Sequence, residues 1–348
     1  MSLPCAICSF CTRTGESHST GFISPDASLN TAGVFIYKQK GKMIFMKRKI
    51  ILTFILFIIT IFLISACGKG SSTKLVNEMS FSLENISDLT ISYDDENISF
   101  FQSENDNLVI KEYMSKDKES YHAKVSQKKN SIQISEGGKP FFKKDFIRYV
   151  EVYLPSAYSA NIKVTTTDGN IDMSDIELNM ESIRIDTTCG TLKINKSAAE
   201  EMYLSSTSGT LELGEIIGDQ IKIETTQGNI TCEKIDGKVT YTSTSGNAEF
   251  LSASGSGTYK ANNSGTLSVI YDEVRGDLTF FNKNDNVQIR IPQDLEFEFE
   301  AITKNGKIDT DFGGDISVNG DLTSGTIGSS PTVTIKVETQ NGNIEVSR

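Results

Sequence analysis

Apolar and polar residues alternate on both sides of a recurring turn in nine segments of this chain. Counted from the turn residue, positions −7, −5, +2 and +4 are mostly apolar, and the residues between them are polar or charged. A period of two predicts a half-buried β-strand on each side of the turn. β-Branched residues are frequent at the apolar positions, as they are in strands. The turn residues are Gly169, Gly190, Gly209, Gly228, Gly246, Gly265, Asp285, Gly306 and Gly342.

The turns follow one another at an almost constant distance. Neighbouring turns are 18 to 21 residues apart, except for the last, which follows after 36 residues. A regular period near 20 predicts a stack of repeated units. We therefore expect an all-β protein, a parallel β-solenoid of about 20-residue coils in which equivalent residues lie above one another. The alternative is a meander of β-hairpins, because Gly-Asn turns also join antiparallel strands.

Two further positions favour stacked coils. Position +1 is Asn or Thr in eight of the nine copies, with Lys307 as the exception. Position −3 should point inward, yet it is small and polar in every copy, which predicts a ladder of buried side chains bonded to the next coil or to the turn backbone. The glycine of each turn is expected to provide a positive φ. The residues at position −3 are Thr166, Thr187, Ser206, Thr225, Ser243, Asn262, Asn282, Thr303 and Thr339.

The regular repeats occupy residues 161–348, and the segment before them is less regular. We interpret residues 81–160 as an irregular β region or a cap of the solenoid, in which a strand ends at Pro155. Within the repeats, residues 311–331 are rich in Gly and Ser and interrupt the period. They are expected to form either a poor coil around Gly325 or an excursion loop.

Residues 46–66 are typical of a lipoprotein signal peptide. Three basic residues, Lys47 to Lys49, precede an apolar run of 17 residues that ends at Ala66, and Cys67 follows. Small residues before a cysteine resemble the lipobox, so Cys67 is the predicted lipidation site. Residues 67–80 would form a flexible tether. The alternative is an uncleaved membrane helix, although 17 residues is short for a span that needs about 20.

Residues 1–45 do not fit this organisation, because a secretory signal belongs at the start of a chain. We expect them to be a disordered upstream extension that results from a misassigned start, with Met46 as the true start. They contain Cys5, Cys8 and Cys11, which suggest an iron–sulfur or zinc site, but no fourth ligand follows at a matching spacing. A metal site is therefore not expected there.

The charge and the scarcity of histidine exclude several classes of function. The formal net charge of −11 disfavours binding to nucleic acid and direct electrostatic binding to anionic lipid. The only histidines, His18 and His122, exclude a His-rich metal site and a Ser-His-Asp triad in the repeats. Cys232 is expected in the core and Cys189 in an exposed turn, so that no disulfide joins them.

Carboxylates are the one remaining source of catalytic chemistry. Asp168, Asp172 and Asp186 could lie near one another on adjacent coils, and an acidic pocket could also bind calcium. The simpler interpretation is that these acids keep a long β surface soluble. No catalytic, cofactor-binding or metal-binding residue is therefore assigned. The outer strand positions are also expected to lack a stacked aromatic stripe for sugars, because Tyr203 and Tyr259 are isolated.

Several motifs in order along the chain resemble a known family. They are the EVYLP strand (151–155), the serial T-x-x-G-[NT]-[IL] turns, FEAITKNGKIDTDF (299–312) and TIGSSPTVTIKVETQNGNIEV (326–346). Over residues 80–348 the chain resembles the bacterial putative-adhesin family of β-strand-repeat proteins of unknown function, which includes LiaG-like envelope proteins. The resemblance implies a right-handed β-solenoid on an exported or membrane-anchored protein, without established catalytic residues.

The sequence thus predicts a non-enzymatic, extracytoplasmic lipoprotein anchored to the cell membrane through Cys67. It would serve as an adhesin or binding scaffold for a cell-wall polymer or an envelope protein, without a cofactor. The resemblance to LiaG suggests an alternative, an envelope-stress accessory protein that contacts a membrane sensor. A third hypothesis is a carbohydrate-active enzyme, because some β-solenoids cleave polysaccharides.

Overall fold

The computed structural model describes residues 72–141, 146–313 and 315–348. Residues 73–348 form one compact unit, in which the strands join into a single 21-stranded sheet with one short 3-10 turn, η1 (Glu119–Tyr121). The strands are β1 (Lys74–Ser82), β2 (Asp88–Ser92), β3 (Asn97–Gln102), β4 (Asn107–Met114), β5 (Lys124–Gln127), β6 (Ser131–Ser135), β7 (Arg148–Leu154), β8 (Asn161–Thr166), β9 (Ile171–Thr187), β10 (Leu192–Ser206), β11 (Leu211–Thr225), β12 (Ile230–Ser243), β13 (Ala248–Ala261), β14 (Leu267–Asn282), β15 (Val287–Arg290), β16 (Phe297–Thr303), β17 (Ile308–Thr310), β18 (Asp315–Asn319), β19 (Leu322–Ile327), β20 (Val333–Thr339) and β21 (Ile344–Ser347).

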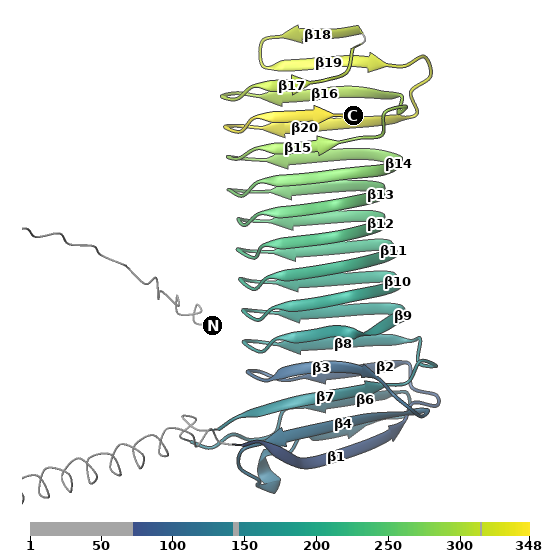
Figure 1. The fold of residues 1–348 in the computed structure, drawn as a ribbon, viewed down its shortest axis with the longest axis vertical. Helices are drawn as coiled ribbons and strands as arrows, with labels where there is room; N and C mark the ends of the chain where they lie inside the picture. Colours follow the sequence, from purple (N-terminus) through teal and green to yellow (C-terminus); the bar gives the residue numbers. More distant parts are fainter. Residues whose placement is uncertain (1–71, 142–145, 314) are drawn as a thin grey trace, which may run out of the picture. The chain divides into compact units, whose positions relative to one another are not determined.

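The central part of this unit is a stack of parallel coils, which we call rungs (Figure 1). Each of the strands β9 to β14 runs from one turn to the next, and it pairs in parallel with the strand before it and the strand after it. In β9, alternate residues are buried in three successive stretches, which are 171–173, 176–180 and 183–187. The sequence pattern predicted the first and third stretches and missed the middle one.

The register distinguishes the two predicted arrangements. Ser206 lies opposite Thr187 on one side and opposite Thr225 on the other, so equivalent residues meet from rung to rung. The two arms of a repeat pair with the arms of neighbouring rungs: β8 pairs with 182–187 of β9, and β3 pairs with 171–175. The parallel β-solenoid is confirmed, and the meander of hairpins is wrong.

The turn glycines are needed for a reason other than the expected one. Among them only Gly246 and Gly265 have a φ in the positive region, at 110° and 113°. Instead, each turn lies almost against the turn before it: a Cβ atom added at Gly190 or at Gly209 would lie 1.9 Å from the carbonyl oxygen of the preceding turn glycine. A real Cβ cannot approach backbone so closely, so the absence of a side chain is what permits the stack.

The asparagines at position +1 form a ladder of hydrogen bonds on the outside of the turns. The Oδ1 atom of Asn170 accepts the backbone N–H of Thr191 at 2.8 Å, and Asn247 accepts that of Thr266 at 2.9 Å. The last bond of the ladder runs from the N–H of Lys307 to Asn343 at 2.9 Å. Position 307 needs no acceptor because no further turn stacks on it. The exception in the sequence therefore marks the end of the ladder.

The side chains at position −3 form hydrogen bonds mainly with backbone groups of the turns. Thr166 accepts the N–H of Gly169 at 3.1 Å and donates to the carbonyl of Asp94 at 3.0 Å. A contact from rung to rung joins the hydroxyls of Thr339 and Thr303 at 2.9 Å. Within the described ranges, three members have a hydroxyl without a partner, which corrects the expectation that all would be bonded; they are Thr187, Thr225 and Ser243.

One copy departs from the predicted register. Asn262 is exposed, and Ala261 takes the ladder position opposite Ser243 and Asn282. The turn before Gly265 therefore holds one residue more than the others, which moves its first arm by one position. As a result Tyr259, expected outside, is fully buried and packs on Phe280 with ring centroids 5.0 Å apart.

At the C-terminal end the rungs do not stack in sequence order. Strand β20 pairs in parallel with both β14 and β16, and β21 pairs with both β15 and β17. The last residues of the chain thus form a rung between two earlier ones. Residues 311–331 are neither a poor rung nor a loop, because β18 and β19 form an antiparallel hairpin that pairs with β16 and closes this end.

The N-terminal end is closed in a similar way (Figure 1). The rung made by β2 and β3 lies between β6–β7 on one side and β8–β9 on the other. Strands β1 and β4 then add to β7 in antiparallel pairing, and β5 pairs with β6 in the same manner. Antiparallel edges at both ends prevent the parallel stack from continuing into another molecule.

Candidate functional site

A cluster of aromatic side chains lies on the outer face of the sheet at the N-terminal end. Alternation along β7 directs Val150, Val152 and Leu154 into the core and the residues between them outward. The register then places Phe101 of β3 opposite Tyr153, and Tyr113 of β4 opposite Tyr149. We call this cluster the aromatic face; it consists of Phe101, Lys111, Tyr113, Tyr149, Glu151 and Tyr153.

The aromatic face is rigid because its members bind one another. The rings of Tyr113 and Tyr149 are stacked with centroids 4.6 Å apart, and those of Phe101 and Tyr153 with centroids 5.3 Å apart. Lys111 from β4 lies over the ring of Tyr153, 4.5 Å from its centroid. Since Phe101 and Lys111 come from strands on either side of β7, the ring of Tyr153 has neighbours on both sides. A sugar would have to displace one of them to stack on this ring.

The carboxylate of Glu151 accepts hydrogen bonds from two tyrosine hydroxyls of the aromatic face. Tyr113 donates to Glu151 at 3.0 Å, and Tyr153 donates to the same carboxylate at 2.9 Å. Burial, together with the hydrogen bond and the negative charge of Glu151, raises the pKa of Tyr113 and of Tyr153 to about 12. Both phenols therefore stay protonated at neutral pH and continue to donate.

The expectation that the outer strand positions lack stacked aromatic side chains is therefore wrong at this end of the sheet. The alternation of Tyr149, Glu151 and Tyr153 in the strand before Pro155 was the available signal. Within the repeats, Tyr203 is not a bare aromatic surface either. Arg184 lies 4.1 Å and Lys222 lies 5.2 Å from the centroid of its ring.

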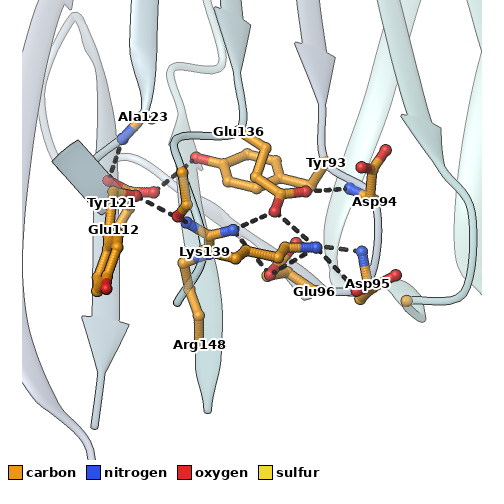
Figure 2. A network of polar contacts seen from close by, with 12 residues as sticks. Tyr93, Asp94, Asp95, Glu96, Glu112, Tyr121, Ala123, Glu136, Lys139 and Arg148 are labelled. Atoms are coloured by element: carbon orange, nitrogen blue, oxygen red, sulfur yellow. Dashed lines mark hydrogen bonds and ion pairs between the residues drawn. The ribbon is translucent and has the colours of Figure 1, made fainter. Parts of the chain in front are cut away.

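A buried ion network also lies at the N-terminal end of the stack, and Figure 2 shows its residues. The guanidinium of Arg148 is fully buried, and its Nη2 atom pairs with Glu96 at 2.8 Å and with Glu136. Its Nη1 atom donates to the carbonyl of Tyr121 at 2.7 Å. Lys139 adds ion pairs to Glu136 at 2.6 Å and to Asp95 at 2.8 Å. The network ties the connection between β6 and β7 to the first turn of the stack.

A second buried carboxylate completes this end. Glu112 accepts hydrogen bonds from the hydroxyl of Tyr93 at 3.3 Å, the N–H of Ala123 at 2.8 Å and the amide of Asn77 at 2.8 Å. Burial and the neighbouring Glu112 carboxylate raise the pKa of Tyr93 well above its usual value. Since the carboxylates of both groups have partners, we interpret them as structural closures of the stack.

The three carboxylates considered for catalysis are not gathered into a site. Asp168 lies in a turn, Asp172 in the first arm of β9 opposite Lys193, and Asp186 in its last arm opposite Ser205. Asp172 accepts the N–H of Ser174 at 2.9 Å. Asp186 is paired with Arg184 at 2.8 Å and accepts the hydroxyl of Ser205 at 2.7 Å. Asp172 and Asp186 thus have the partners of ordinary surface acids.

The structure describes two of the cysteines considered in the sequence, Cys189 and Cys232. Cys232 is buried in the core, where burial raises the pKa of its thiol to about 12, and both Cys189 and Cys232 are free. Cys67 lies outside the described residues, as do Cys5, Cys8 and Cys11. In residues 72–141, 146–313 and 315–348 no group of three or more His, Cys, Asp or Glu side chains could hold a metal ion. No helix in these ranges is long and apolar enough to span a membrane.

Several solved structures of bacterial proteins are similar to this chain. The chain is similar to a protein titled "putative adhesin" from Parabacteroides distasonis, at 12% identity and a TM-score of 0.41, over 79% of this chain and 98% of that one. A second "putative adhesin", from Bacteroides fragilis, is similar at 15% identity and a TM-score of 0.32, over 80% of this chain and 100% of that one. A "putative cell adhesion protein" from Clostridium sporogenes is similar at 10% identity and a TM-score of 0.26, over 79% of this chain and 99% of that one.

No protein of curated function matches the chain in sequence. A family model, by contrast, matches residues 86–347 and is described as Toastrack DUF4097. This range begins just before β2 and ends in β21, so it takes in all of the described strands except β1. The resemblance to a putative-adhesin family of unknown function is thereby confirmed: the chain belongs to the Toastrack DUF4097 family.

Proposed function

We propose that this protein is a non-enzymatic binding scaffold of the bacterial cell envelope, held outside the cytoplasmic membrane by a lipid on Cys67. The observation that supports the scaffold is the continuous parallel stack, in which each rung is fixed by its neighbours. Outer charged side chains pair along and between rungs, as Lys234 does with Glu215 at 2.8 Å. Such a surface is stiff and soluble, as a presenting scaffold requires.

The partner of this scaffold would be a cell-wall polymer or a protein of the envelope. One observation favours the alternative, an envelope-stress accessory protein that contacts a membrane sensor. The aromatic face lies on β3, β4 and β7, and β4 pairs directly with β1, the strand that follows Cys67 most closely in sequence. A partner bound there would be close to the membrane. Cross-linking in intact cells, followed by identification of the bound partner, distinguishes a sensor from a wall polymer.

A carbohydrate-active enzyme is the third hypothesis, and a turnover assay on a panel of polysaccharides tests it. We expect no turnover by the wild-type protein, because Asp168, Asp172 and Asp186 have separate surroundings. If turnover is found, the Asp168→Asn and Asp172→Asn variants tell whether these carboxylates take part. Any turnover by the wild-type protein contradicts the non-enzymatic scaffold, and unchanged turnover in both variants removes these two carboxylates from consideration.

The Cys67→Ser variant tests the anchor. We expect it to lose labelling by radioactive palmitate completely and to leave the membrane fraction, because the thiol is the acceptor of the diacylglycerol. Cys189→Ser is the matched control, since it removes another free thiol and should keep the full label. The lipoprotein proposal fails if the wild-type protein takes up no palmitate.

A further inference from the structure

Three exposed apolar residues mark one edge of the N-terminal sheet. Leu75 is 43% exposed, Ile147 is 47% exposed and Phe141 is 94% exposed, whereas most large apolar side chains of the described residues are buried. We call these three residues the apolar edge. Exposed apolar residues that gather in one place indicate an interaction site, while single ones are common on any surface.

The register brings the apolar edge together. Leu75 of β1 lies opposite Tyr113 of β4, which lies opposite Tyr149 of β7. Ile147 precedes that strand, and its carbonyl accepts the N–H of Ser115 at 2.9 Å. Leu75 and Ile147 thus flank the stacked pair Tyr113–Tyr149 of the aromatic face.

Phe141 is held near the same place by the buried ion network. Two residues before it, Lys139 pairs with Glu136, which in turn pairs with Arg148 at the start of β7. Gly138 also donates its N–H to the carbonyl of Ser120 at 2.7 Å. Arg148 Nη1 also donates to the carbonyl of Gly138 at 3.4 Å, so the backbone that leads to Phe141 is held close to Arg148, the first residue of β7.

The chain before β1 indicates what this edge contacts. Leu75 follows Cys67 by only eight residues, and the apolar run from Ile50 to Ala66 directly precedes Cys67. A fully extended segment of that length reaches at most about 29 Å. We propose that the apolar edge lies in the interface of the lipid bilayer beside the anchor, so that the stack touches the membrane at a second point. This inference depends on the lipid anchor of the proposed function.

The chemistry of the edge favours lipid over a wall polymer. Aliphatic and phenylalanine side chains offer no hydrogen bonds to a glycan, and the ring of Tyr153 has Phe101 and Lys111 as neighbours. Tyrosine beside aliphatic side chains is typical of the interface between lipid and water. The chain is acidic overall, so burial of apolar surface, and not attraction to anionic lipid, would hold the edge in place. The contact should therefore persist at high salt, which screens any contribution from charged side chains near the edge.

The absence of tryptophan from this chain permits a direct test. Phe141→Trp places a single fluorophore in the apolar edge, and Val318→Trp places one on the hairpin strand β18 that closes the other end, where Val318 is 71% exposed. Each full-length variant is reconstituted into vesicles of phosphatidylethanolamine and phosphatidylglycerol. Emission is then recorded with and without brominated acyl chains, at low and at high salt.

We expect Trp emission from the Phe141→Trp variant to shift to shorter wavelength in vesicles and to lose most of its intensity with brominated lipid, at both salt concentrations. The Val318→Trp variant should show neither change. Floating of both variants with the vesicles, together with unquenched emission at position 141, overturns the edge contact and leaves the anchor intact. Failure of the wild-type protein to float overturns both. A shift with purified cell-wall polysaccharide but not with vesicles would make the edge a polymer site instead.

Discussion

Replacement of Arg148 by methionine is expected to lower the free energy of unfolding by about 3–5 kcal/mol, the usual cost of removing one partner from a buried ion pair. The side chains of Glu96 and Glu136 are only 5% and 10% exposed, and among the described residues Lys139 would be the one cation that still pairs with them. Two carboxylates would then share a site from which water is largely excluded. Urea unfolding followed by circular dichroism measures the loss.

The matched control for Arg148 is Arg184→Met. Arg184 pairs with Asp186 at a similar distance of 2.8 Å, but its side chain is 46% exposed. An exposed pair of this kind contributes about 0–1 kcal/mol. Equal losses in the two variants would show that the network at the N-terminal end is not the buried closure described above.

Replacement of Gly209 by alanine is expected to cost about 3 kcal/mol, at the upper end for an overpacked interior, because the added methyl group meets backbone that cannot rotate away. The new Cβ would lie 1.9 Å from the carbonyl oxygen of Gly190. A shift of one turn to relieve this contact would disturb the turns stacked above and below it. Thermal or urea unfolding, again followed by circular dichroism, gives the change.

Gly313→Ala separates this steric effect from the general effect of removing a glycine. Nothing lies within 4 Å of a Cβ added at Gly313. Gly→Ala at such a site normally stabilises by about 0.4–1 kcal/mol, because it restricts the unfolded chain. The two substitutions should therefore have opposite signs. A stabilising effect at position 209 would contradict the close approach of successive turns.

The arms beside the turns were predictable because each turn is short and each arm alternates strictly. Ile183, Ile185 and Thr187 all point inward as the pattern required. The prediction failed in one arm before Gly265, where a single extra turn residue exchanges the inner and outer sides. It also missed the middle stretch of each rung. Small residues at Ala198, Ala199, Gly218 and Gly237 weaken the apolar alternation there.

The ends of the stack were not predictable from a local pattern. A strand such as β20 has the same alternation whether it lies beside β16, β14 or both, so its place depends on contacts between residues far apart in sequence. The same holds for the aromatic face and for the ion network. The network joins Glu96, Glu136 and Arg148, and the spacing of these residues in the sequence does not predict that they lie together.

The position of β20 and β21 inside the stack has a consequence for how the protein is made. The strands on both sides of β20 and β21 precede them in sequence, so the layer that they form is synthesised after both of its neighbours. Until β20 and β21 have emerged from the ribosome, the layers formed by β14–β15 and by β16–β17 lack the layer between them, and β16 has no parallel neighbour. A nonsense mutation after β19 would therefore remove a middle layer and not an end, and the hairpin of β18 and β19 would cap a rod with a gap beneath it.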